Sequence, residues 1–135
     1  LEVVYSSTQC DQINENEWIT SKAQLDKLLQ ATLGRMISPA PVPSPAVDFD
    51  HYGVLLLSMG QQRTGGYAIQ LADNQLQMND SVAIVRINWR EPRPGMMVTQ
   101  ALTAPCLFIK VPRGEYHTLR AVDQRQTVRA ELTVN

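Results

Sequence analysis

The sequence predicts a mainly β fold: an antiparallel β-sandwich or barrel-like sheet of six to eight strands, with one amphipathic helix near the N-terminus. From Tyr52 onward, apolar and polar residues alternate in short runs that Gly, Pro, Asn and Asp separate. No helical periodicity follows Gly34, so the helices that βαβ crossovers require are missing. The length of 135 residues suits one core, and we expect a single domain over residues 1–135.

The helix is expected over residues 21–33, because leucines recur there at helical spacing. Ser21 and Gln24 have the form of a capping box, and Gly34 supplies a helix stop. Beyond it, four prolines alternate with other residues, which removes backbone donors and fixes φ. We therefore expect an extended, Pro-rich surface connector at residues 38–47.

The strands differ in how they should be buried. Residues 54–59 are apolar on both faces, as in a central strand, and residues 107–111 alternate cleanly. A further strand should begin at Val98. Inward-facing positions in two other strands are Ala83, Val85, Ile87 and Trp89, and then Val128, Ala130, Leu132 and Val134.

Residue types argue against catalysis and against nucleic acid. A formal net charge of -1 does not favour a polyanionic partner. His51 and His117 are the two histidines, and a pair of Cys106 with His117 would lack a nucleophile elbow and an oxyanion glycine. Asp48, Asp50 and His51 are better explained as a polar strand entry than as metal ligands. We expect no enzyme activity, no cofactor and no metal.

The two cysteines leave two alternatives open. Cys10 and Cys106 can form a disulfide in an oxidising compartment, or they can be separate buried thiols in a reducing one. The chain opens at Leu1 without an initiator Met, which fits a removed signal peptide or an arbitrary boundary. No apolar run approaches the length of a transmembrane helix.

Two bends stand out as candidate binding loops. Residues 61–67 contain consecutive glycines, which permit positive φ or close approach of another chain. In residues 91–95, Pro94 and Gly95 suit the middle of a type II turn, which would place Arg93 at its tip. The sequence does not determine whether the two bends are adjacent.

These residues resemble the PrcB C-terminal domain family, named for a subunit of a secreted bacterial protease complex. The likeness covers about residues 19–123. It rests on Thr-Gly-Gly-Tyr at 64–67, Pro-Gly at 94–95, Val-Thr-Gln-Ala-Leu-Thr-Ala-Pro at 98–105 and Ile-Lys-Val-Pro at 109–112. The family usually has an aromatic residue where this chain has Cys106. A special role for this thiol would therefore be particular to this chain.

The resemblance implies an exported, non-enzymatic accessory domain in the periplasm or cell envelope that associates with a protease or stabilises it. Some members are lipoproteins, so the resemblance leaves open whether a lipid anchor lies upstream of Leu1. The candidate binding residues are Arg63, Thr64, Gly65, Gly66, Tyr67, Arg93, Pro94, Gly95, Thr99 and Gln100.

Two other functions remain open. Residues 64–67 and Arg93-Pro94 partly resemble two loops of chagasin-like cysteine protease inhibitors, although the middle glycine-rich loop is missing and Gln62-Arg63 replace the start of the first. A small-molecule or glycan-binding sandwich is the second alternative. Its aromatic candidates are Trp18, Trp89, Tyr52 and Tyr67, which are also suited to core packing.

Overall fold

The computed structural model describes residues 1–10, 12–33 and 46–134. Within these ranges the chain forms one helix and nine strands. Their order is β1 (Glu2–Ser7), β2 (Glu17–Ile19), α1 (Lys22–Leu33), β3 (Tyr52–Ser58), β4 (Ala68–Leu71), β5 (Gln77–Asn79), β6 (Val82–Arg90), β7 (Cys106–Pro112), β8 (Thr118–Val122) and β9 (Val128–Thr133). The predicted helix stop at Gly34 and most of the predicted connector at 38–47 lie outside the described residues.

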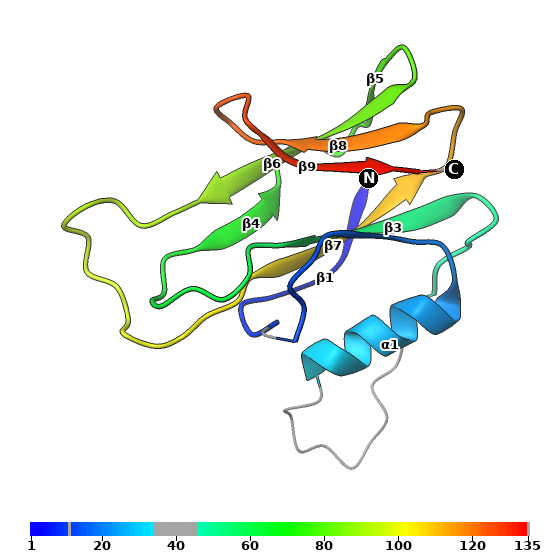
Figure 1. Ribbon diagram of the computed structural model, residues 1–135. Coiled ribbons are helices and arrows are strands. Elements are labelled where there is room, and N and C mark those ends of the chain that lie inside the picture. The colour runs from blue at the N-terminus through cyan, green and yellow to red at the C-terminus, as the bar shows by residue number, and fades with distance from the viewer. Residues whose placement is uncertain (11, 34–45, 135) are drawn as a thin grey trace.

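The strands form two sheets that face each other (Figure 1). The first has the order β1-β7-β3-β2 and is antiparallel throughout, with Leu55 opposite Ile109 at its centre. The second has the order β4-β6-β8-β9, and β5 extends it beside β6. Here β6 and β8 are parallel, because the chain leaves β6, crosses to the first sheet as β7, and returns as β8. The predicted mainly β, sandwich-like fold class is confirmed.

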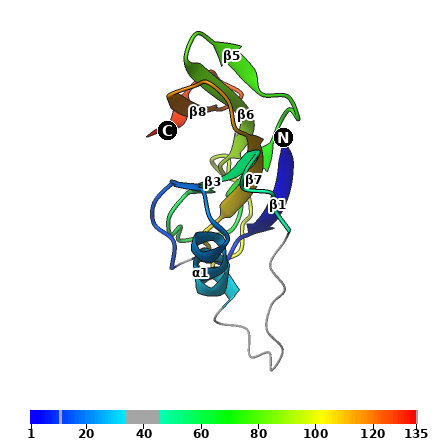
Figure 2. The same cartoon turned by 90° about the vertical axis from the view of Figure 1, so that its right-hand side faces the viewer.

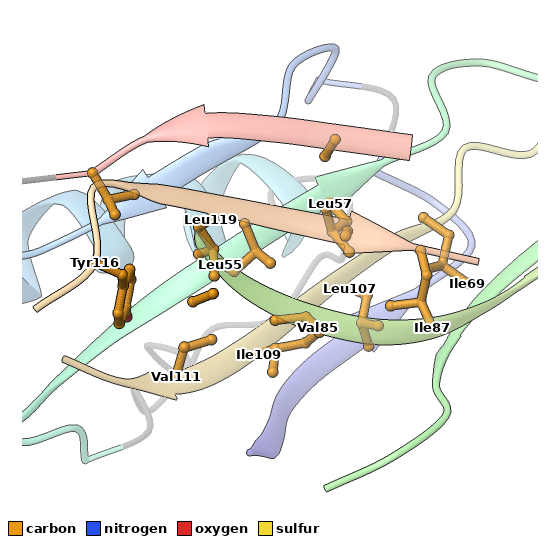
Figure 3. Close-up of a cluster of buried hydrophobic side chains, with 14 residues drawn as sticks. Leu55, Leu57, Ile69, Val85, Ile87, Leu107, Ile109, Val111, Tyr116 and Leu119 are labelled. Atoms are coloured by element: carbon orange, nitrogen blue, oxygen red, sulfur yellow. The ribbon is translucent and has the colours of Figure 1, made fainter. Parts of the chain in front are cut away.

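The main core lies between the sheets (Figure 3). The first sheet contributes alternate residues of β3 and β7, such as Leu55 and Ile109, and the second contributes alternate residues of β6 and β8, such as Val85 and Leu119. All four of these side chains are at most 1% exposed. This alternation is the one predicted from the sequence, because successive side chains of a strand point to opposite faces.

The helix covers the other face of the first sheet, so α1, the first sheet and the second sheet form three layers (Figures 1 and 2). Leu25 and Leu29 of α1 pack in one cluster with Leu56 and Phe108 of the sheet. Half of the predicted capping box is present, since the Gln24 backbone N–H donates to Ser21 Oγ at 3.2 Å. The Gln24 side chain accepts from the Thr20 N–H at 3.3 Å instead of from Ser21. Two-sided burial explains why β3 reads as a nearly continuous apolar run. The clean alternation expected at residues 107–111 is corrected, because Phe108 is also fully buried, on the helix side.

Cys10 and Cys106 form a disulfide within this helix-side cluster, with their Cα atoms 5.9 Å apart. Cys10 follows β1, and Cys106 opens β7. The bond joins positions separated by 96 residues. Of the two alternatives that the sequence left open, the disulfide is the one the structure contains.

Several details differ from the sequence expectations. Nine strands replace the expected six to eight because β2 and β5 are only three residues long. No strand begins at Val98; residues 95–102 of the described chain are irregular. Val128 is 47% exposed instead of inward, because a register shift interrupts the pairing of β8 with β9 between Ala121 and Val122. Neither β1 nor β2 was expected from the sequence.

Candidate functional site

The two predicted binding bends lie against each other. Gln62 and Thr103 exchange two backbone hydrogen bonds of 2.7 and 2.9 Å. The Gly65 N–H donates to the Thr99 carbonyl at 3.0 Å, and Thr103 Oγ1 donates to the Thr64 carbonyl at 2.7 Å. We call residues 61–67 and 91–103 together the loop face. The contact with the second bend itself is at Gly66, where an added Cβ would lie 3.0 Å from Pro92, so the two bends are adjacent.

Each glycine of the first bend has its own structural reason. A Cβ added to Gly65 would clash with Thr99 Oγ1, so the Thr99 side chain would have to rotate to admit it. Gly66 has a φ of +94°, and a Cβ there would lie 3.0 Å from Pro92 and 3.1 Å from Val98. The positive φ expected from the sequence is therefore present at Gly66, whereas the close approach is made by other residues of the same chain; approach of a partner stays a prediction.

The second bend has the predicted turn. The Met96 N–H donates to the Arg93 carbonyl at 3.0 Å, which closes the four-residue turn. Gly95 has a φ of +80°, as its position in a type II turn requires. Arg93, Pro94 and Gly95 are exposed at the tip.

The loop face carries apolar side chains that sequence reasoning missed. Met96 is 52% exposed, Met97 97% and Leu102 58%. They make up half of the large exposed apolar side chains among the described residues. Two adjacent methionines in a segment between prolines and without strand alternation were the available signal, because such residues have no core to enter. Methionine is common on surfaces that adapt to protein partners.

The structure brings most of the predicted binding residues together, while their role in binding stays a prediction. Thr64, Gly65 and Gly66 lie half-buried against the second segment of the loop face. Tyr67 is also half-buried. The remaining predicted residues are exposed, namely Arg63, Arg93, Pro94, Gly95, Thr99 and Gln100.

Beside the loop face is a hollow of about 510 Å³, which we call the arginine hollow. It is lined by the end of β6, the second bend and the turn between β8 and β9: Asn88, Trp89, Arg90, Glu91, Pro92, Arg93, Pro94, Gln124, Arg125 and Arg129. A second hollow of about 420 Å³ continues it along the loop face, since Arg90, Glu91 and Arg93 line both. From this set, sequence reasoning singled out the bend residues Glu91, Pro92, Arg93 and Pro94, and Trp89 as an aromatic candidate.

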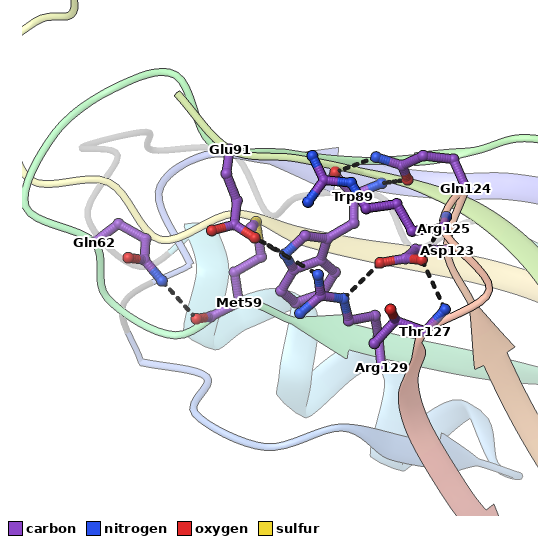
Figure 4. A network of polar contacts seen from close by, with 9 residues as sticks. All are labelled: Met59, Gln62, Trp89, Glu91, Asp123, Gln124, Arg125, Thr127 and Arg129. Carbon is purple, nitrogen blue, oxygen red and sulfur yellow. Dashed lines mark hydrogen bonds and ion pairs between the residues drawn. The ribbon is translucent and has the colours of Figure 1, made fainter. Parts of the chain in front are cut away.

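A polar network forms one side of the arginine hollow (Figure 4). The Arg129 guanidinium lies over the Trp89 ring, 4.5 Å from its centroid. Arg129 Nε donates to Asp123 Oδ2 at 2.8 Å, and its Nη2 is 3.6 Å from Glu91 Oε1. The Trp89 indole N–H donates to the same Glu91 oxygen at 3.2 Å. The side chain of Arg129 is therefore held in one position by three neighbours.

Asp123 anchors this network and is 1% exposed. Its Oδ1 accepts the backbone N–H groups of Arg125 at 2.8 Å and Thr127 at 2.9 Å. Burial alone would raise the pKa of Asp123, but the hydrogen bonds from Thr127, Arg129 and Arg125 outweigh it, so the pKa is lowered. Asp123 is therefore a buried carboxylate that remains charged at neutral pH.

Gln124 continues the sheet with its side chain. Its Oε1 accepts the Trp89 N–H, and its Nε2 donates to the Trp89 carbonyl, both at 2.8 Å. β8 ends at Val122, so this amide bonds β6 beyond the end of the backbone pairing. Both backbone polar groups of Trp89 are therefore held by one side chain at the edge of the hollow.

The cysteine and histidine side chains that the sequence offered for catalysis have other partners in the structure. The sulfur of Cys106 is bonded to Cys10, so it is not a thiol that His117 could activate. His51 Nδ1 is 2.6 Å from Asp48 Oδ2 at the exposed entry to β3. Their hydrogen bond is the main cause of the raised pKa of His51 and of the lowered pKa of Asp48. In the described ranges, no three His, Cys, Asp or Glu side chains gather as a metal site.

The segment that contains both bends also matches a known protein family. Residues 54–112 match the PrcB C-terminal family model. The match runs from β3 through β7 and contains both bends, which confirms the resemblance to the PrcB family seen in the sequence. No curated protein and no solved structure matched the chain. As for membrane segments, no helix among the described residues has the length and apolar character needed to cross a bilayer.

Proposed function

We propose that this chain is a non-enzymatic, exported protein–protein interaction domain whose loop face binds a protease of the cell envelope, as an accessory or stabilising subunit. The observation that carries the proposal is the loop face itself, in which interlocked bends present Met96, Met97 and Leu102 to solvent. The match of residues 54–112 to the PrcB C-terminal family supports a protease-associated role.

The interlocked bends favour binding because they reduce its entropic cost. Pro92 and Pro94 restrict φ in the second bend, and the bonds from Gly65 and Gln62 tie the first bend to Thr99 and Thr103, in the segment that follows the second bend. A loop that is ordered before it meets its partner loses less conformational freedom on docking. The exposed methionines then supply apolar area that can adjust to the partner's surface.

The disulfide supports export. Disulfides persist in oxidising compartments such as the bacterial periplasm, and they are rare in the cytosol. The Cys10–Cys106 bond fits an envelope location. It also supports a non-enzymatic role, since it occupies the sulfur of Cys106, the strongest nucleophile considered in the sequence.

The proposal is tested by capture from envelope extract of the source cells. The purified domain is immobilised, and recovered proteins are compared between the wild type, Met97→Ser and Met78→Ser. Met97 is 97% exposed on the loop face, whereas Met78 is 53% exposed on β5 in the second sheet. We expect the wild type and Met78→Ser to retain the same protease and Met97→Ser to recover several-fold less.

Two results would contradict the proposal. One is equal recovery by both methionine variants, which would remove the loop face from binding. The other is turnover of a peptide or glycoside substrate by the pure domain, which would make it an enzyme. Inhibition of papain-like proteases at micromolar domain concentration would instead favour the chagasin-like alternative.

A further inference from the structure

We propose that the arginine hollow binds the carboxylate side chains of an acidic segment of a partner protein. The class of ligand, a protein segment, rests on the proposed function. The hollow continues into the loop face through Arg90, Glu91 and Arg93, so a partner bound to that face can reach it. It goes beyond that function by assigning a second contact with its own chemistry.

The lining of the arginine hollow is strongly basic. Four arginines line the hollow against one carboxylate, in a chain whose formal net charge is -1. Arg90, Arg93 and Arg125 are exposed, and their guanidinium groups have no hydrogen bond or ion pair within the described part of the chain. Three unpaired guanidiniums around one hollow offer several donor pairs in a geometry that suits carboxylates.

The polar network of Arg129 forms a fixed wall beside the free arginines. Arg129 bridges Glu91 and Asp123 and is stacked on Trp89, so the single carboxylate of the lining is already paired. This network keeps one net negative charge, and the three free arginines of the lining outweigh it. Because Trp89 and Arg129 are held in place, little of the hollow's wall must be ordered on binding.

Other polyanions fit the hollow less well. Single-stranded nucleic acid needs aromatic faces for its bases to stack on, and the ring of Trp89, the aromatic residue in the lining, is already covered by Arg129. A membrane surface would call for a broad basic face, whereas this charge is concentrated in a hollow of about 510 Å³. A short run of Asp or Glu side chains matches both its size and its charge.

The test uses fluorescently labelled, end-blocked hexaglutamate and hexaglutamine peptides, with binding followed by anisotropy at about 10 mM ionic strength, where the Debye length is about 30 Å. The variant Arg90→Gln/Arg125→Gln removes two free charges of the hollow. The matched control, Lys22→Gln/Lys27→Gln, removes two exposed charges from α1 on the far layer. Urea unfolding of each protein establishes that all are folded.

We expect wild-type protein to bind hexaglutamate and not hexaglutamine. The hollow variant should weaken that binding about tenfold, and the helix control less than about twofold. Equal weakening by both variants would overturn the inference, since net charge alone would then explain binding. So would binding of phosphatidylglycerol vesicles without binding of hexaglutamate. If hexaglutamate fails to bind while capture still depends on Met97, the inference is wrong and the proposed function stands.

Discussion

Asp123→Asn is the substitution that tests the polar network most sharply. The asparagine has nearly the same shape, and its oxygen can still accept the two backbone N–H groups of Arg125 and Thr127. In the wild type, Asp123 Oδ2 accepts from Arg129 Nε at 2.8 Å; in the variant, the amide nitrogen takes the place of this oxygen and is itself a donor. One charge-assisted hydrogen bond is lost, and two donors are left facing each other.

The expected cost follows from burial. A hydrogen bond to a charged group contributes roughly 1.5–3 kcal/mol, and a buried donor without a partner adds about 1–3 kcal/mol. Arg129 keeps part of its solvation because its side chain is 26% exposed, which reduces the second contribution. We expect Asp123→Asn to lower the free energy of unfolding by about 2–4 kcal/mol at pH 7.

Urea unfolding followed by tryptophan fluorescence measures this loss, because Trp89 lies beside the network. The loss should depend on pH. The pKa of Asp123 is lowered in the folded protein, so its stabilising effect is present above the ordinary value of 3.8 and disappears as the pH falls through the folded pKa. The difference between wild type and variant should therefore shrink as the pH is lowered below 3.8.

The matched control is Glu131→Gln. Glu131 pairs with Arg120 at 2.9 Å, but its side chain is 55% exposed, so the pair should contribute at most about 1 kcal/mol. Two results would refute the reasoning about burial. One is an equal loss in the two variants at pH 7, and the other is a loss in Asp123→Asn that is the same at pH 7 and pH 3.

Three further predictions concern other parts of the chain. Cys10→Ser/Cys106→Ser should lower the free energy of unfolding by about 4–5 kcal/mol, measured by urea unfolding, and reductant should destabilise only the wild type. A variant as stable as the oxidised wild type would contradict this prediction. Gly66→Ala should cost more than Gly60→Ala in thermal unfolding, because both have positive φ but only Gly66 has neighbours within 4 Å of the added Cβ; equal costs would contradict the close approach. In an NMR titration, the pKa of His51 should lie above 6.5 and fall in Asp48→Asn; no change would show that their hydrogen bond is absent in solution.

The strands that the sequence predicted well are those buried on one or both faces. β3 and β7 have helix-side and sheet-side neighbours, so their apolar runs reflect their environment directly. β1 was missed because its burial is partial: two of its six residues, Val4 and Tyr5, pack against the helix-side cluster. It is held at the sheet edge by backbone pairing with β7, and its strand-favouring Val3-Val4-Tyr5 run was the signal that was overlooked.

The site was predictable only where a local turn rule applied. Pro94-Gly95 specifies its turn within four residues, and Gly66 has the expected positive φ. The contact of Gly65 with Thr99 joins residues 34 positions apart, and pairing of single residues replaced the strand expected from Val98. The network of Asp123 and Arg129 depends on the fold bringing a β8–β9 turn to the end of β6, which no local pattern encodes.

Site-specific crosslinking tests the central claim about the loop face most directly. A photo-crosslinking amino acid is placed at position 97 or, as the control, at position 78, and cells are irradiated before the envelope is isolated. The account predicts one dominant adduct with an envelope protease from position 97 and none from position 78. No adduct from position 97, or the same adducts from both positions, would contradict it.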